Sequence, residues 1–312
     1  MICWSSTTNC DSQTTTAVSV FIAPLMWYNA KKSRNENGNG AGEMITEIHN
    51  LENYTDLINR IAGNPRCSDP HFTYDPRNLD SALRKADHKV YVTSENGMAN
   101  GIFAWVILPE DRYAELIVGL SENAAAWEEM LGLIERENPG VQMDFVINPN
   151  HDVLRGILQC RGAAFEKEQK KFRLARETET ADDPGVGELR PEYEEQYREV
   201  HTKDAYWTAE RILEARDQFR VFAATEQGKL VGYLDVTTGH SENEPYDLWA
   251  APGFEHCKKA MLAAAIRRNR PNGMMVQIDT DDAAEIALYE SIGFEAIERS
   301  ESVYATYRSG GQ

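Results

Sequence analysis

The segment APGFEHCKKAML, residues 251–262, places a histidine, a cysteine and two lysines between an apolar run and a pattern typical of a helix. His256 and Cys257 are the residue types of a nucleophile and its general base. Neighbouring positions on a helix point in different directions, however, and the sequence shows no third group that would orient the histidine. We therefore do not expect covalent catalysis at this pair.

The same segment could bind an anion through its backbone. A turn that opens a helix points several N–H groups outward, and the helix dipole favours negative charge there. Glycines usually allow a phosphate to approach closely, but this turn has only Gly253, and Lys258 adds bulk. Glu255 places a negative charge where the ligand would be anionic. Lys258 and Lys259 either compensate in part or form a solvated helix face, and we expect weakened phosphate binding.

Composition limits the kinds of partner. The chain has 312 residues, which is long for one hydrophobic core, so we expect two domains. Its 50 acidic and 32 basic residues give a net charge of -18, which disfavours nucleic acids and anionic membranes and favours cationic partners such as amines. The five cysteines show neither disulfide nor metal-ligand spacing, and no apolar run is long enough to span a membrane. We expect a cytoplasmic protein without a metal.

The first 43 residues differ from the rest of the chain. Their polar start, their apolar stretch with Pro24 and the segment KKSRNENGNGAGE lack the basic beginning and the cleavage site of a signal peptide. A strand and a helical pattern begin directly at Met44. We expect residues 1–43 to be a disordered extension and hypothesise that Met44 is the native start, which the intact mass of the native protein would test.

The chain contains an internal repeat. Residues 91–105 align without a gap on residues 222–236, at the offset of 131 residues that separates Gly101 from Gly232. The same offset carries Gly162 onto Gly293. Each half has helices, a hairpin, a βαβ unit and a last strand. We predict an α/β (α+β) chain with two tandem domains, each with a mixed, mostly antiparallel sheet flanked by helices, at residues 44–176 and 187–308, joined by a linker at 177–186.

Residues 281–298, DDAAEIALYESIGFEAIE, resemble the closing part of the GNAT (general N-acetyltransferase) fold, with its helix, tyrosine and Gly-Phe turn. The second half is similar to this superfamily also through YWTAERI, VGYLDVT and NEPYDL, at 206–212, 231–237 and 243–248. The first half resembles it only in outline. The resemblance implies acetyl-CoA as donor and a primary amine of a small molecule or peptide as acceptor, in direct transfer within a ternary complex.

The resemblance also implies roles for single residues. Tyr289 matches the tyrosine that protonates the departing thiolate, although it could instead be a core aromatic. Glu244 could accept the proton of the attacking ammonium, or be a solvated acid in its turn. Tyr206 and Trp207 lie where family members build the acceptor wall, or they pack in the core. Contacts with the coenzyme are expected from Leu248, Ala250, Glu255, His256, Cys257, Lys258, Lys259, Ala260 and Asp282.

Both halves depart from the family pattern. The turn of the first half, at residues 121–131, has no glycine and three glutamates, and Leu158 stands at the position that corresponds to Tyr289. In the second half, Ala260 is the only residue of the turn at 251–262 that matches the family pattern. We therefore expect chemistry in the second half alone. The rival hypothesis is a non-catalytic binding or regulatory protein with a decayed pyrophosphate turn. Neither the acceptor nor the oligomeric state is predicted.

Overall fold

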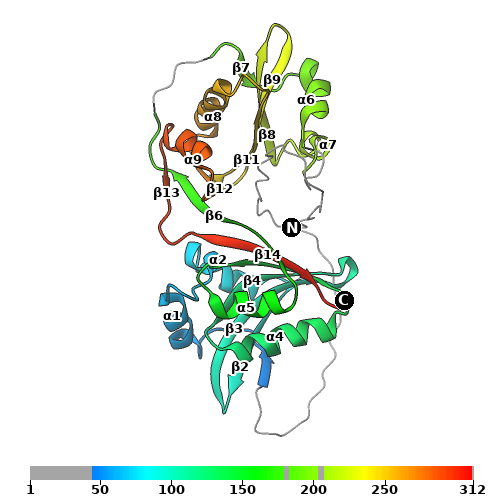
Figure 1. The fold of residues 1–312 in the computed structure, drawn as a ribbon, viewed down its shortest axis with the longest axis vertical. Coiled ribbons are helices and arrows are strands. Elements are labelled where there is room, and N and C mark those ends of the chain that lie inside the picture. Colours follow the sequence, from blue (N-terminus) through cyan, green and yellow to red (C-terminus); the bar gives the residue numbers. More distant parts are fainter. Residues whose placement is uncertain (1–43, 179–182, 203–206, 311–312) are drawn as a thin grey trace. The chain divides into compact units, whose positions relative to one another are not determined.

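The computed structural model describes residues 44–178, 183–202 and 207–310 (Figure 1). These residues form two compact units, which we call the N-terminal unit and the C-terminal unit. The N-terminal unit comprises the described residues up to Gln169 together with those from Glu298 onward, and the C-terminal unit comprises those from Lys170 to Ile297. The division therefore differs from the expected boundaries at 176 and 187. None of the helices in these described ranges is long and apolar enough to cross a membrane.

The N-terminal unit is a sheet covered by helices. Its strands run in the order β1-β2-β3-β4-β5, and neighbours are antiparallel except for the parallel pair β4 and β5. One apolar cluster lies under α4 and α5, and a second lies under α1 to α3, so both faces of the sheet are buried. The elements are β1 (Met44–Glu47), α1 (Thr55–Gly63), α2 (Pro70–Tyr74), α3 (Arg77–Ala82), β2 (His88–Glu95), β3 (Met98–Leu108), a 3-10 turn (Pro109–Asp111), β4 (Tyr113–Ser121), α4 (Ala124–Glu137), β5 (Gln142–Ile147), α5 (Asp152–Cys160) and β6 (Ala164–Leu174).

The final strand of the chain completes the N-terminal unit. Instead of one last strand in the second half, the structure has β13 (Phe294–Ala296) and β14 (Ser302–Arg308). Strand β14 pairs antiparallel with β5 and with the beginning of β6, whereas β13 pairs with the end of β6. The reason is burial: Val303, Ala305 and Tyr307 alternate inward into the N-terminal core. That alternation predicts a strand but does not indicate which core it joins.

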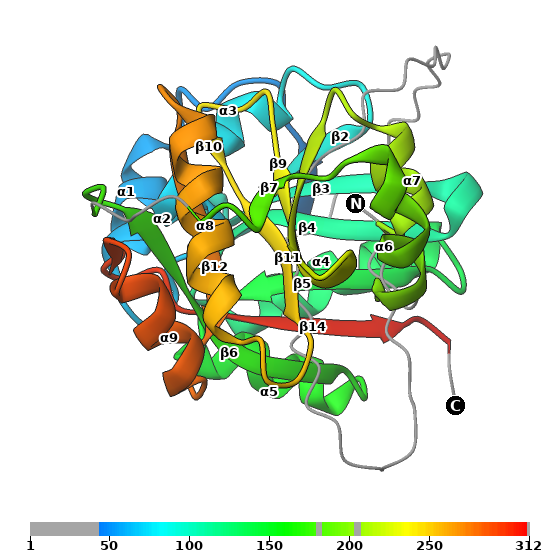
Figure 2. The ribbon, with the colours of Figure 1, turned by 90° about the horizontal axis from the view of Figure 1, so that it is seen from above.

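The C-terminal unit has a four-stranded sheet in the order β11-β9-β8-β7, and β12 lies outside that sheet, beside β6. Helices α8 and α9 share one apolar cluster, and α6 and α7 belong to a second cluster on the other side of the strands (Figure 2). The elements are β7 (Val186–Glu188), a 3-10 turn (Pro191–Tyr193), α6 (Glu194–Val200), α7 (Ala209–Glu214), β8 (Phe219–Glu226), β9 (Lys229–Thr237), β10 (Glu242–Asn243), β11 (Pro245–Ala250), α8 (His256–Asn269), β12 (Gly273–Asp279) and α9 (Ala283–Glu290).

The two units repeat the same order of elements, as the sequence predicted. Strands β2 and β8 have bounds that differ by the offset of the repeat, and so do the first residues of β3 and β9, whereas β9 ends two residues earlier than the offset would place it. Both hairpins turn at a glycine with positive φ, 79° at Gly97 and 79° at Gly228. Their registers also shift at matching places, after Thr93 and after Ala224. The repeat is therefore a repeat of backbone geometry.

Candidate active site

The candidate site of the C-terminal unit lies where two strands part. Glu242 and Asn243 pair in parallel with the start of β12, but from Pro245 onward the chain pairs with β9 instead. Within the described residues β11 pairs with β9 alone, so its other edge offers unpaired backbone groups. Leu248 and Ala250 lie on this edge strand, half-buried against the core under α8. The backbone of β11 at Leu248 and Ala250 can therefore form hydrogen bonds with an extended ligand, in agreement with the coenzyme contacts expected there.

A bulge shapes the start of β11. Pro245 pairs with Val236 and Asp247 with Asp235, so Tyr246 is the extra residue. A bulge bends its strand and re-aims the neighbouring side chains. The bulged residue lies two positions after Glu244, just beyond the point where the pairing with β12 ends at Asn243.

Tyr289 lies on α9 and is 1% exposed. Its ring packs edge-on against Phe294, with ring centroids 5.1 Å apart. Its hydroxyl makes no hydrogen bond to any residue that the structure describes. Burial, together with the charges of Glu285, Glu244 and Asp247, raises the pKa of Tyr289 well above its usual value. Tyr289 is thus both a core aromatic and a protonated hydroxyl that could donate to a ligand.

Glu244 is fixed through its backbone at the point where the strands part. Its N–H donates to Thr237 Oγ1 (2.7 Å) and its carbonyl accepts from the Thr237 N–H (2.9 Å). Its carboxyl has no hydrogen-bond partner among the described residues. Burial raises the pKa of Glu244 to about 8, against the opposing charge of Lys171. Such a group exchanges protons near neutral pH, which suits a general base.

The predicted phosphate turn holds an anion of its own. Helix α8 begins at His256, and the carboxylate of Glu255 accepts hydrogen bonds from the N–H of Gly253 (3.1 Å) and from its own N–H. These hydrogen bonds lower the pKa of Glu255. The Glu255 side chain is exposed to solvent. An external phosphate would therefore bind these N–H groups only after the carboxylate rotates away.

The remaining residues of the turn fit an anionic ligand in part. The first turn of α8 contains no acidic residue, and it carries Lys258, half-buried, and Lys259, exposed. Ala260 follows them and is half-buried. A cation in the first turn opposes the helix dipole unless it meets an anion, so the two lysines gain a role if a phosphate binds.

The pair His256 and Cys257 is not a nucleophile and base. His256 is exposed, whereas Cys257 is buried, and burial raises the pKa of the Cys257 thiol to about 11. Cys257 Sγ packs against the backbone of β9, where a Cβ added to Gly232 would come within 2.8 Å of it. The close approach of α8 to β9 thus depends on that glycine.

Two other predicted contacts have structural roles. Asp282 is the N-cap of α9, where its Oδ1 accepts from the Glu285 N–H (2.9 Å). Trp207 packs its ring against Phe219, with centroids 4.7 Å apart, in the core under α6 and α7. Tyr206 lies outside the described residues.

The C-terminal unit contains a buried polar network that was not predicted from the sequence. Asp235 on β9 is fully buried; its Oδ2 lies 2.9 Å from His201 Nε2, and its Oδ1 accepts from the Tyr197 hydroxyl (2.9 Å). Asp247 on β11 accepts from the Tyr233 hydroxyl (2.7 Å) and lies 3.9 Å from His201 Nε2. The available signal was that single acids interrupt apolar strands in GYLDVT and PYDLWA.

The polar atoms of His201 and Asp235 that could bind a metal are engaged in hydrogen bonds. His201, Asp235 and Asp247 bring their possible ligand atoms within 4.8 Å of one another. However, His201 Nδ1 donates to the Thr202 carbonyl (2.9 Å), and Nε2 faces Asp235. Burial disfavours the imidazolium, but the hydrogen bond and charge of Asp235 outweigh it and raise the pKa of His201. In Asp235 it is burial that raises the pKa, to about 6. The group is best described as a buried ion pair.

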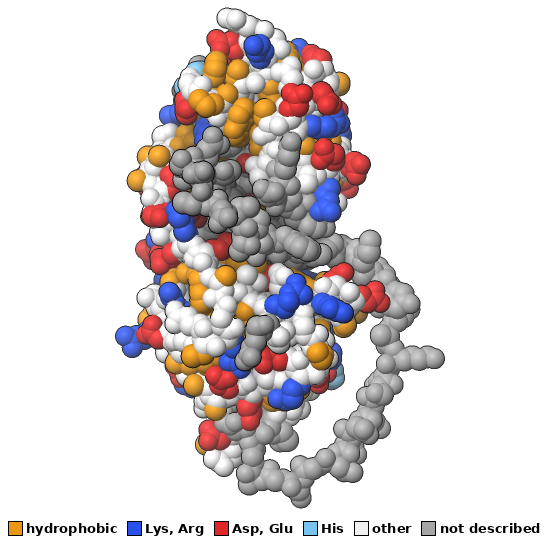
Figure 3. All heavy atoms as spheres, turned by 45° about the vertical axis from the view of Figure 1, so that its right-hand side comes forward, with side chains coloured by type: hydrophobic (Ala, Val, Ile, Leu, Met, Phe, Trp, Pro, Cys, Tyr) orange, Lys and Arg blue, Asp and Glu red, His pale blue; other side chains and the backbone are white. Residues whose placement is uncertain are grey.

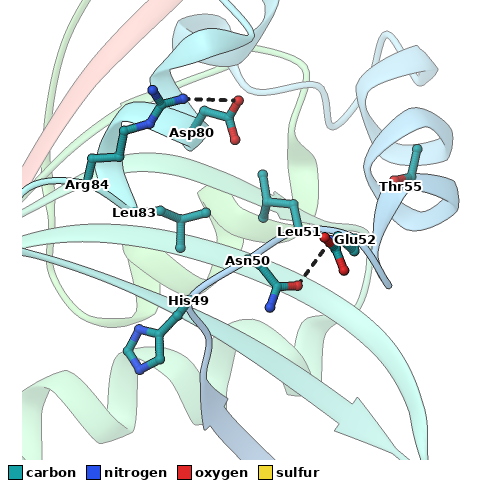
Figure 4. A pocket seen from close by; sticks show the side chains of 8 residues that line it. All are labelled: His49, Asn50, Leu51, Glu52, Thr55, Asp80, Leu83 and Arg84. Carbon is teal, nitrogen blue, oxygen red and sulfur yellow. Dashed lines mark hydrogen bonds and ion pairs between the residues drawn. The ribbon is translucent and has the colours of Figure 1, made fainter.

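A pocket in the N-terminal unit contains none of the predicted site residues (Figure 4). It has a volume of about 450 Å³ and lies between the loop after β1 and helix α3. Its rim carries an exposed ion pair of Arg84 and Asp80 (3.7 Å). The face of the molecule in Figure 3 shows acidic and basic side chains interspersed, without a continuous basic patch among the described side chains.

Comparison with known proteins defines the class of the fold. The chain is similar to a GCN5-related N-acetyltransferase from Sphaerobacter thermophilus, with a TM-score of 0.53 and 11% identity over 85% of this chain and 95% of that one. It is also similar to the glucosamine N-acetyltransferase region of a fungal multi-domain GH3 beta-N-acetylglucosaminidase, with a TM-score of 0.52 and 11% identity over 86% of this chain and 38% of that one. The chain therefore has a GNAT fold, and the predicted fold class is confirmed.

A tandem GNAT protein from the clavulanic acid biosynthesis pathway is similar as well, with a TM-score of 0.49 and 15% identity over 86% of this chain and 99% of that one. No family model matches the sequence, and no curated protein matches it.

Proposed function

We propose that the C-terminal unit transfers an acetyl group from acetyl-CoA to a primary amine, and that the N-terminal unit has a structural role. The observation that carries this proposal is that the Tyr289 hydroxyl and the Glu244 carboxyl have no hydrogen-bond partner among the described residues and lie close enough for the charge of Glu244 to act on Tyr289, beside the open edge of β11. A donor and an acceptor of protons, both desolvated, are what amide formation from an ammonium and a thioester requires.

Acetyl-CoA would supply the activated acyl group. Glu244 would accept the proton that the attacking ammonium must lose, and the Tyr289 hydroxyl would donate a proton to the departing sulfur. The edge of β11 at Leu248 and Ala250 would hold the extended arm of the coenzyme and orient its carbonyl. The helix start at Lys258 and Lys259 would bind the pyrophosphate once the Glu255 carboxylate has moved aside.

The test is thiol release from acetyl-CoA with a panel of primary amines, by the chain from Met44 onward. The Tyr289→Phe variant should lose transfer by about 100-fold or more, because general acid catalysis typically contributes that much. Tyr193→Phe makes the same chemical change in the same unit and should leave transfer within about twofold of wild type, since that ring lies outside the site. Equal transfer by wild type and Tyr289→Phe would contradict the role of the hydroxyl.

The rival function, binding or regulation without catalysis, is favoured by the occupied turn at Glu255. Calorimetric titration with acetyl-CoA distinguishes it from catalysis. Micromolar binding by the wild type would support the enzyme. No binding by the wild type, with binding gained in a Glu255→Arg, Lys258→Gly double variant, would show that the turn is a relic.

A further inference from the structure

Asp247 is a carboxylate with one oxygen fixed and one oxygen available. Its Oδ2 accepts hydrogen bonds from the Tyr233 hydroxyl (2.7 Å) and from Thr202 Oγ1 (3.4 Å). Its Oδ1 has no hydrogen-bond partner among the described residues, and its side chain is 21% exposed. The network thus holds Asp247 in one orientation and presents an oxygen to whatever lies beside β11.

The charge of Asp247 is not neutralised within the described part of the buried network. Among the described residues, the ion pair of Asp247 is with the imidazolium of His201, which is 2.9 Å from Asp235 but 3.9 Å from Asp247. The pair of His201 and Asp235 is neutral as a whole, because each compensates the other. A negative charge therefore remains at Asp247, at the partly exposed end of an otherwise buried network.

A second observation points to a ligand on the other side of the same strand, β11. Tyr289 is 1% exposed, yet its hydroxyl has no partner in the part of the chain that the structure describes. The charges of Glu285, Glu244 and Asp247 all act on this hydroxyl. Asp247 lies with Tyr233 on the side of α6 and α7, and Tyr289 lies with α9 on the other side, so both sides of the sheet reach the open edge of β11.

The surroundings of the two carboxyls suit different tasks. No donor in the described part of the chain reaches the Glu244 carboxyl to stabilise its charge, and the carboxyl can take up a proton. Asp247 accepts two hydrogen bonds, an arrangement that suits a carboxylate and would keep a bound ammonium charged. An amine that stays charged cannot attack a thioester, so the group at Asp247 is not the one that reacts.

This inference rests on the proposed function. We propose that Asp247 binds a second, non-reacting ammonium group of the acceptor, so that the substrate class is an aliphatic diamine or polyamine. The reacting amine would lie near Glu244 and Tyr289, and the other ammonium group would lie at Asp247 Oδ1. The net charge of -18 would attract such a ligand over distance.

The experiment compares 1,4-diaminobutane with 1-aminobutane, as acceptors and as ligands in calorimetry without coenzyme. Wild type should prefer the diamine in kcat/KM by about tenfold or more, because a charge-assisted hydrogen bond commonly contributes that factor. Asp247→Asn keeps an oxygen for the Tyr233 hydroxyl and removes the charge. It should remove the preference, mainly through a higher KM for the diamine, so that the loss of kcat/KM for the diamine exceeds any loss for the monoamine by about tenfold.

Two further variants keep the result interpretable. Glu290→Gln removes an exposed carboxyl on α9 and should keep the preference, which separates a local effect from a change in net charge. Asp247→Glu retains the charge and replaces Asp247→Asn if the latter does not fold; it should weaken diamine binding by several-fold while monoamine transfer persists.

The outcomes separate this inference from the proposed function. Equal use of both amines by wild type, or an equal loss for both amines in Asp247→Asn, would overturn the diamine site and leave acetyl transfer standing. Diamine binding that Asp247→Asn abolishes, in a protein that transfers no acetyl group, would support the site and contradict the enzyme. Displacement of the diamine by Zn²⁺ or Mg²⁺ bound at Asp247 would show a metal site and overturn the inference.

Discussion

The two units share a backbone plan and differ in the few polar residues placed on it. At the repeat offset, Asp235 and Tyr289 correspond to Ala104 and Leu158, so the N-terminal unit has apolar side chains where the C-terminal unit has its network and its hydroxyl. One acid is common to both. Glu115 pairs with Val106 as Glu244 pairs with Thr237, at the matching strand position. Apolar periodicity builds either unit, whereas isolated polar substitutions decide which unit has a candidate site.

Glu115 and Glu244 occupy matching positions but differ in the hydrogen-bond partners of their carboxyls. Glu115 is buried and accepts from the Tyr113 hydroxyl (3.1 Å) within its own strand. The Glu244 carboxyl has no hydrogen-bond partner among the described residues. The pKa is raised at both sites, chiefly by burial, to about 7 for Glu115 and about 8 for Glu244. Burial alone therefore does not make a catalytic acid or base, and an accessible, unpartnered group is also needed.

The largest expected effect comes from removing β14, which tests whether the units are independent. A chain ending at Ser300 should lose the folded N-terminal unit, because β5 and β6 lose their common partner and the core loses Val303, Ala305 and Tyr307. The C-terminal unit should keep its structure. Hydrogen exchange measures both: amides of β2 to β5 should lose protection, and those of β8 and β9 should retain it.

A chain ending at Ser309 is the control, and it should behave as the full chain. Equal loss of protection in β8 and β9 after removal of β14 would contradict the division into units. This would mean that the C-terminal unit depends on the N-terminal unit for its stability.

The second effect uses two glycines that correspond in the repeat. Gly293 has φ 101°, and an added Cβ would lie 1.9 Å from the Arg176 carbonyl oxygen. Gly162 has φ 75°, and nothing lies within 4 Å of an added Cβ. Gly293→Ala should therefore lower the free energy of unfolding by more than about 3 kcal/mol, whereas Gly162→Ala should lower it by about 1 kcal/mol, the penalty of left-handed backbone alone. Denaturant unfolding of both variants is the measurement, and equal losses would contradict the contact with Arg176.

These glycines also show what the sequence could predict. The offset from Gly162 to Gly293 and the gapless match of the hairpins predicted element types and order in both units. The destination of β14 was not predictable, because the alternation of Val303, Ala305 and Tyr307 fits any half-buried strand. The network was missed because His201, Asp235 and Asp247 come from separate segments. The position of the Glu255 carboxylate depends on side-chain geometry in the turn, which the residue type does not specify.

The smallest effect concerns the shared acid and is a dependence on pH. In Glu244 the folded pKa, about 8, exceeds the usual value of 4.5, so the folded protein binds more protons between these values. The free energy of unfolding should therefore fall as pH rises from 4.5 to 8, by at most about 1.4 kcal/mol per pH unit. The contribution of Glu115 to this fall should end near pH 7, where its folded pKa lies. Between pH 7 and pH 8 the fall should be smaller in Glu244→Gln than in wild type and unchanged in Glu115→Gln, as measured by denaturant unfolding at each pH.

Transfer activity distinguishes the same two variants more sharply than stability does. If Glu244 is the base, activity of the wild type should rise as the pH passes through about 8, because only the carboxylate form accepts the proton of the ammonium. Glu115→Gln should leave that profile unchanged, since Glu115 is held by Tyr113 in a unit that lacks a counterpart of Tyr289. Glu244→Gln should abolish the rise. A profile that Glu115→Gln alters as much as Glu244→Gln would mean that both units take part in the chemistry.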